Sequence, residues 1–280
     1  MDLLVFQSMW AMEGLPFEGA EWTLEEQVRR MAEAGFDGAE VDFDDLESSL
    51  RVTSLLKEHG LKWNATCFPK TVDDLRPIIE WIELCGAEHC HHINLQPNIR
   101  PSRALDCIPY ILGWQSLADE AGIDLLFENH RDRMTTDLLF TLQLIDAVPS
   151  MKLTADLSHF LVAREFRIPL SDEDDALIQR ILRRSWAYHG RVASREQIQL
   201  QLSFPHNQVW VEMFRRWWGQ GFQLFRQSNP ESATLTFTAE LGPPEWYAMT
   251  GSDGAELSDR WAEALLLRDM ARSLWAAEGN

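Results

Sequence analysis

Short apolar segments alternate along the chain with longer segments in which apolar residues recur every three to four positions. The short segments, bounded by turn residues, begin near Leu3, Phe36, Leu61, His91, Ile123, Met151, Ser185 and Ala233. This alternation is typical of repeated βα units, which build parallel sheets. Eight such units in roughly 250 residues match one (β/α)8 barrel. We therefore predict an α/β fold, with residues 1–280 forming a single TIM-barrel domain.

Local signals mark the ends of the expected helices. Thr23 followed by Glu26 forms a capping box, and Gly35 stands where that helix would end. The next helix is expected to end at Gly60, and a third to begin at Thr71. No G-x-G-x-x-G follows the first strand, which disfavours an open dinucleotide-binding sheet.

The connection between the seventh and eighth strands, around residues 194–232, is longer than the others. It carries Trp210, Trp217 and Trp218, so we expect it to cover the barrel mouth or to form a subunit contact. The last segment, residues 257–280, is expected to form a helix that closes the barrel. A homo-oligomer is a further expectation.

Composition excludes several classes of protein. The formal charge of −19 disfavours binding to nucleic acid, because the surface would repel a polyanion. We find neither a signal peptide nor an apolar run of membrane-spanning length, which predicts a cytoplasmic protein with no membrane partner. The four cysteines follow no paired spacing, so we expect reduced, mostly buried thiols.

The strongest candidate chemistry lies at the ends of the last four strands. Glu128 and Asp156 follow the fifth and sixth apolar segments, and His189 and Glu240 end the seventh and eighth. The carboxyl ends of barrel strands meet at one mouth, so these side chains are expected to converge. Three carboxylates and one imidazole suit Mn²⁺, Mg²⁺ or Co²⁺ and are compatible with Zn²⁺.

Other polar and aromatic residues are expected near the same mouth. They are Trp10, Glu40, Asn94, Gln96, His130 and Arg191. Substrate binding and ordinary structural bonding are alternatives for the polar members, and Trp10 could stack on a sugar or belong to the core.

The order Glu, D-x-x-H, His, Glu resembles the xylose isomerase-like barrels. That family includes ketose 3-epimerases, hydroxypyruvate isomerase, 3-dehydroshikimate dehydratase and the type IV AP endonucleases. The resemblance covers nearly the whole chain, and the segments DLSHF, HGRV and ELGPPEWY carry it most clearly. It implies that Glu128, Asp156, His189 and Glu240 hold one divalent cation, with Mn²⁺ favoured. It also implies that Glu128 and Glu240 transfer protons on opposite faces of the substrate.

The likeness to the ketose epimerases extends to two more positions. His159, at the end of D-x-x-H, and Arg195, six residues after His189, fall where those enzymes bind substrate. Met134 stands where they carry a further glutamate, so the sugar contacts differ.

These features predict a divalent-metal-dependent isomerase or epimerase of carbohydrate metabolism. It would act on a small sugar or polyol-derived ketone through a metal-stabilised enediolate. A dehydratase or hydrolase using the same metal is the main alternative. An AP-endonuclease-like phosphodiesterase is disfavoured, because the stretch EQIQLQLSFPH lacks the aspartate of the required D-x-H. A sugar-binding barrel without catalytic activity is the remaining alternative.

Overall fold

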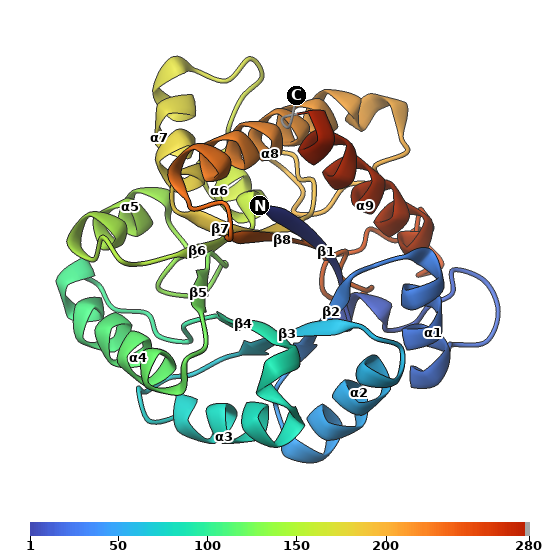
Figure 1. The fold of residues 1–280 in the computed structure, drawn as a ribbon. Coiled ribbons are helices and arrows are strands. Elements are labelled where there is room, and N and C mark those ends of the chain that lie inside the picture. Colours follow the sequence, from blue (N-terminus) through green and yellow to red (C-terminus); the bar gives the residue numbers. More distant parts are fainter. Residues whose placement is uncertain (278–280) are drawn as a thin grey trace.

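The eight short apolar segments form eight parallel strands that close into a barrel in sequence order (Figure 1). The computed structural model describes residues 1–277. The strands are β1 (Asp2–Ser8), β2 (Gly38–Asp42), β3 (Lys62–Cys67), β4 (Cys90–Leu95), β5 (Leu125–Glu128), β6 (Leu153–Ala155), β7 (Ser185–Gly190) and β8 (Thr234–Ala239). Every strand begins close to its predicted position, and the (β/α)8 barrel is confirmed.

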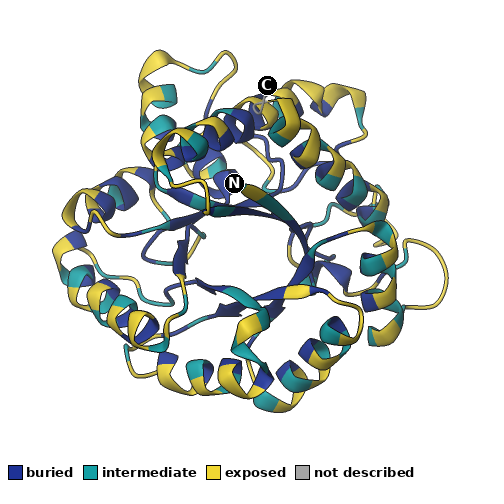
Figure 2. Ribbon diagram, in the orientation of Figure 1, coloured by how far each residue is buried: buried dark blue, intermediate teal, exposed yellow. Residues whose placement is uncertain are grey.

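Helices surround the barrel, and each turns one face to the strands. They are α1 (Leu24–Ala34), α2 (Leu46–Glu58), α3 (Leu75–Cys85), α4 (Ile108–Ala121), α5 (Leu138–Ala147), α6 (Leu157–Arg164), α7 (Asp172–Leu182), α8 (Gln208–Ser228) and α9 (Arg260–Ala277). Figure 2 shows that the strands are almost entirely buried and that the helices expose their outer faces. The apolar core therefore lies between strands and helices.

The predicted helix ends are mostly confirmed. The capping box of Thr23 and Glu26 is present, and Gly35 ends α1 in the left-handed conformation, with φ 78°. The third helix begins later than predicted. The Asp74 carboxylate accepts hydrogen bonds from the amides of Lys70 and Thr71, both at 2.9 Å, so the segment from Thr71 forms a turn and α3 begins at Leu75.

The long connection after β7 contains α8, which packs on the barrel wall. Trp217 and Trp218 are fully buried, and the Trp218 ring lies edge-on to Phe237 of β8 with the ring centroids 5.1 Å apart. These two indoles fill the core and cannot themselves form a subunit contact, whereas a contact through the exposed face of the connection stays a prediction. Near the start of the connection, Gln199 exchanges two hydrogen bonds with the backbone of Gly242.

The barrel closes where β1 pairs with β8, from Asp2–Thr234 to Gln7–Ala239. The buried Arg260, at the start of α9, donates hydrogen bonds to the backbone oxygens of Ala11 and Glu13. The expected final helix is α9, which the structure describes from Arg260 to Ala277, and residues 278–280 of the prediction lie outside the described part.

Two further expectations concern the cysteines and the membrane. All four cysteines are free, and Cys67, Cys85 and Cys107 are buried, as predicted for reduced thiols. Within residues 1–277, no helix combines the length and apolar character needed to cross a bilayer.

Candidate metal centre

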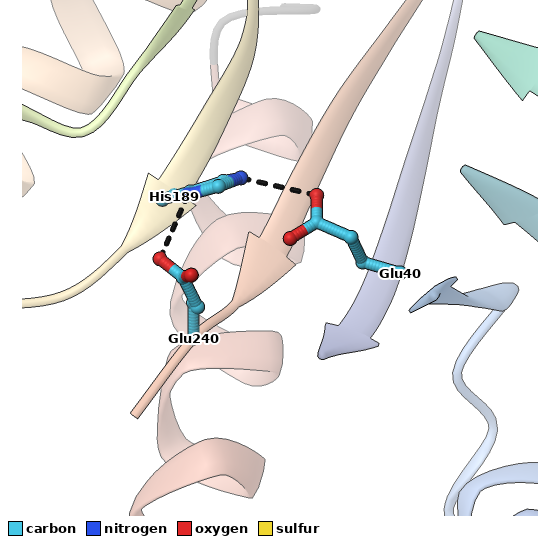
Figure 3. Close-up of side chains that lie close together, drawn as sticks. All are labelled: Glu40, His189 and Glu240. Atoms are coloured by element: carbon cyan, nitrogen blue, oxygen red, sulfur yellow. Dashed lines mark hydrogen bonds and ion pairs between the residues drawn. The ribbon is translucent and has the colours of Figure 1, made fainter. Parts of the chain in front are cut away.

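His189 is the centre of a buried polar cluster at the carboxyl ends of the strands. Its Nδ1 lies 2.7 Å from Oε2 of Glu240, and its Nε2 lies 3.1 Å from Oε2 of Glu40. Figure 3 shows the imidazole between these two carboxylates. Strands β7, β8 and β2 therefore bring together residues that are 149 positions apart in the chain.

These three side chains could share one cation. Among residues 1–277, Glu40, His189 and Glu240 are the potential ligands whose donor atoms all lie within 4.8 Å of one another. His189 and Glu240 were predicted as metal ligands, and Glu40 as a substrate contact. The structure therefore adds Glu40 to the neighbourhood of the predicted metal.

Glu128 approaches the same imidazole from β5. Its Oε1 lies 3.7 Å from Nδ1 of His189. Asn94 donates a hydrogen bond of 2.7 Å to Oε2 of Glu128, and Gln96 donates bonds of 3.0 Å to both carboxylate oxygens. Asn94 and Gln96, at the end of β4, thus orient Glu128. This is the structural bonding that was one of the two alternatives for these residues, and substrate binding by them stays a prediction.

Asp156 lies beyond the fully buried guanidinium of Arg191. Nε of Arg191 lies 3.5 Å from Oδ2 of Asp156, and its Nη2 lies 2.5 Å from Oε2 of Glu240. His159 also faces Asp156, with Nε2 3.4 Å from Oδ2. The four predicted ligands therefore line one mouth, but Arg191 bridges two of them. The complete ligand set stays a prediction.

The two carboxylates that flank His189 have pKa values that are shifted in opposite directions. Burial raises the pKa of Glu128 to about 8, although the charge of His189 opposes this. Burial also acts to raise the pKa of Glu240, but His189 and Arg191 outweigh it and lower the pKa to about 2. Burial lowers the pKa of His189, yet Glu240 and Glu40 together raise it well above its ordinary value.

The donor set fits a divalent cation. Oδ2 of Asp156 is buried and has no hydrogen-bond partner within the described chain. The buried carboxylates of Glu40, Glu128, Asp156 and Glu240 face one guanidinium and one imidazole. A doubly charged cation would supply the positive charge that these side chains lack, and the oxygen-rich set suits hard metals.

A cavity of about 340 Å³ opens from this cluster to solvent. Of the predicted residues, Trp10, Glu40, Gln96, His130 and Glu240 line it. Trp10 packs edge-on against Tyr247 with ring centroids 5.4 Å apart, so it is both a packed residue and a cavity wall.

His159 and Arg195 have different environments. His159 is buried and its ring centroid lies 4.2 Å from that of His130, which bonds the Tyr247 hydroxyl at 2.9 Å. The Arg195 guanidinium is exposed, is paired with Glu196 and does not line the cavity. The predicted substrate contact of Arg195 therefore has no support from its position, and it stays a prediction.

Several cavity residues were missed, among them Tyr247 and Asp42. Tyr247 lines the cavity and lies under Arg191, whose guanidinium carbon is 4.2 Å from the ring centroid. Asp42 follows Glu40 by two positions, so strand alternation places it on the same face of β2. That spacing was the available signal for Asp42. The available signal for Tyr247 was its place in the segment ELGPPEWY, which follows the eighth strand at the barrel mouth.

Solved structures of similar fold cover almost the whole chain. A xylose isomerase-like TIM barrel protein from Mycobacterium smegmatis in complex with magnesium has a TM-score of 0.64 at 15% identity, over 98% of this chain and 97% of that chain. A D-allulose 3-epimerase from Methylomonas sp. has a TM-score of 0.58 at 14% identity, over 99% and 98%. The probable 3-DHS dehydratase AsbF from Bacillus anthracis has a TM-score of 0.55 at 14% identity, over 96% and 97%. At these identities the likeness shows the fold alone.

No curated protein sequence matches the chain significantly. Residues 28–206, more than half of the chain, match the family model described as the xylose isomerase-like TIM barrel. The match spans β2 to β7 and so includes Glu128, Asp156 and His189. The chain belongs to the xylose isomerase-like TIM barrel family.

Proposed function

We propose that the protein is a divalent-metal-dependent isomerase or epimerase acting on a small sugar or polyol-derived ketone. The observation that carries the proposal is the pair of buried carboxylates, Glu128 and Glu240, which flank Nδ1 of His189 and whose pKa values are shifted in opposite directions, upward for Glu128 and downward for Glu240. Titratable pairs whose environments separate their pKa values are a feature of acid–base catalysis.

Glu128, Asp156, His189 and Glu240 would hold the cation, with Glu40 bonded to the far side of the imidazole. When bound, the cation supplies positive charge that stabilises an enediolate. We propose Mn²⁺, with Mg²⁺, Co²⁺ and Zn²⁺ as alternatives. The excess of buried carboxylates supports a dication over a monovalent ion.

Glu240 and Glu128 have complementary parts in this proposal. Glu240, with its lowered pKa, is ionised near neutral pH and removes a proton from the carbon beside the carbonyl. Glu128 is the second proton-transfer carboxylate, on the other face of the substrate, and Asn94 and Gln96 hold it in place. Return of a proton to the same carbon from the other face gives an epimer. Return to the neighbouring carbon gives an aldose–ketose isomer.

The cavity walls suit a polyhydroxylated ligand. Trp10 offers an aromatic surface on the cavity wall. Arg191 and His159 do not line the cavity, but they are buried directly behind two residues that do, Arg191 against Glu240 and His159 against His130. We propose that these residues, together with His130, bind the substrate.

The test is to incubate the purified protein with Mn²⁺ and a panel of ketoses in D₂O. We expect deuterium in the product of one sugar, seen by NMR. Glu240→Gln should abolish incorporation and leave the circular dichroism spectrum unchanged, whereas Asp44→Asn, at the exposed rim of the cavity, should remain active. Full activity of Glu240→Gln would refute the assigned role. A product lighter by one water would replace this proposal by the dehydratase alternative.

A further inference from the structure

The interior of the barrel beneath the metal centre contains several polar side chains. Strand alternation places Asn64 of β3, His92 and Asn94 of β4, Thr154 of β6 and Thr236 of β8 on the inner face. All five side chains are at most 1% exposed. The interior of a (β/α)8 barrel is normally filled by branched aliphatic side chains, which need no hydrogen bonds. Here the apolar Phe6, Leu126 and Ala187 fill only part of the inner face, and the polar atoms beside them need partners.

Those partners are not side chains or backbone groups. Both amide atoms of Asn64, Oδ1 of Asn94 and the hydroxyls of Thr154 and Thr236 are buried without a hydrogen-bond partner in residues 1–277. Buried polar groups in proteins are almost always satisfied, and ordered water satisfies those that protein atoms do not reach.

His92 leads to the same conclusion through its tautomers. Its Nδ1 lies 3.0 Å from Nδ1 of His91, so one of the two nitrogens donates and the other accepts. If His92 donates, its Nε2 carries a lone pair, and if His92 accepts, its Nε2 carries a proton. Nε2 of His92 has no partner in the described chain, so either tautomer leaves a buried group unsatisfied.

The two members on β4, His92 and Asn94, lie between two openings of the barrel. His92 lines a cavity of about 160 Å³ at the amino-terminal end of the barrel, together with Asp124 and Trp186. Asn94 follows two positions later on β4 and donates to Glu128 at the metal centre. Alternate residues of a strand lie about 6.6 Å apart, a gap that bridging water spans.

We infer that this polar lumen, formed by Asn64, His92, Asn94, Thr154 and Thr236, is a binding site for a cluster of ordered water molecules. The cluster lies between the amino-terminal cavity and the metal centre. Water bonded to Oδ1 of Asn94 keeps the amide turned so that its nitrogen donates to Glu128. The hydration does not depend on the proposed activity, whereas the positioning of Glu128 rests on it.

The test is a crystal structure of the full chain at a resolution that shows ordered water. We expect density peaks within hydrogen-bond distance of Asn64, Thr154 and Thr236. Thr236→Val, which keeps the side-chain shape, should remove the peak beside residue 236 and leave the others. Thr53→Val is the matched control, because the buried Thr53 hydroxyl already donates to the Ser49 oxygen at 2.7 Å. It should leave every lumen peak in place.

Side chains that bond one another, with no density between them, would overturn the inference. A peak that persists unchanged in Thr236→Val would show that the hydroxyl does not hold it, and would also count against the inference. Failure of the proposed activity would leave these peaks unchanged, so the two results are distinguishable.

Discussion

Replacing Glu40 tests whether it orients His189 or binds the metal itself. Oε2 of Glu40 lies 3.1 Å from Nε2 of His189, on the side of the ring opposite Glu128 and Glu240. A carboxylate in this position keeps the proton on Nε2, leaves Nδ1 free for the metal and makes it more basic. We therefore expect Glu40→Gln and Glu40→Ala to weaken metal binding.

The size of the effect follows from the geometry. Losing an outer partner of a ligating histidine weakens metal binding about 10- to 100-fold, which corresponds to about 1.4–2.7 kcal/mol. Glutamine retains an acceptor for Nε2 and removes only the charge, so Glu40→Gln should weaken metal binding about 10-fold. Alanine removes both the acceptor and the charge, so Glu40→Ala should weaken metal binding about 100-fold.

The assay is competition for Mn²⁺ between the protein and a fluorescent chelator, near neutral pH. Asp44→Asn is the control, because this exposed residue lines the same cavity and carries the same charge but does not contact His189. If Glu40→Gln weakens binding no more than Asp44→Asn, the orienting role is refuted. A loss far beyond 100-fold in both Glu40 variants would make Glu40 a direct ligand.

Three further predictions follow from the structure. Asp42 has its pKa raised to about 8 by burial and by Glu40, so the folded protein retains a proton that the unfolded chain releases above about pH 4. The resulting stability is lost progressively as the pH rises from about 4 to 8. The free energy of unfolding of Asp42→Asn, measured with urea, should therefore rise relative to that of wild type between pH 5 and pH 9, by about 1–3 kcal/mol over that interval. Gly221→Ala should lower the free energy of unfolding by about 1–3 kcal/mol, because the new Cβ would lie 2.0 Å from the Tyr188 hydroxyl. Gly219→Ala is the control, because its nearest contact would be at 3.5 Å, and it should be neutral or stabilising. Mn²⁺ at about 100 times its Kd should add about 2.7 kcal/mol to the free energy of unfolding and raise Tm by roughly 5–10 °C. A chelator should reverse the rise, and an unchanged Tm would count against a metal site.

The barrel could be predicted because its periodicities are local. Each strand is a short apolar run followed by an amphipathic helix, and signals such as Thr23, Glu26 and Gly35 act within a few residues. The start of α3 could not be predicted, because it depends on the Asp74 carboxylate reaching the amides of Lys70 and Thr71. Side-chain geometry therefore decides where α3 begins.

The site was predictable to the level of a shared mouth. Strand order brings Glu128, His189 and Glu240 together, whatever the side-chain conformations. The insertion of Arg191 between Asp156 and Glu240 was not predictable, because alternation places Arg191 on the inner face but does not say which carboxylate it will contact. Such contacts depend on the packing of many neighbours at once.

The seam between β1 and β8 has a consequence for synthesis of the chain. β1 is made first, but its second hydrogen-bonding neighbour begins only at Thr234, and Arg260 follows later still. Ribosomes add about 5–20 residues per second, so one edge of β1 stays unpaired for roughly 10–50 s. Unpaired strand edges promote association between chains. The nascent protein is therefore most exposed to aggregation just before its last strand emerges, and a chaperone that covers β1 during that interval would raise the yield of folded protein.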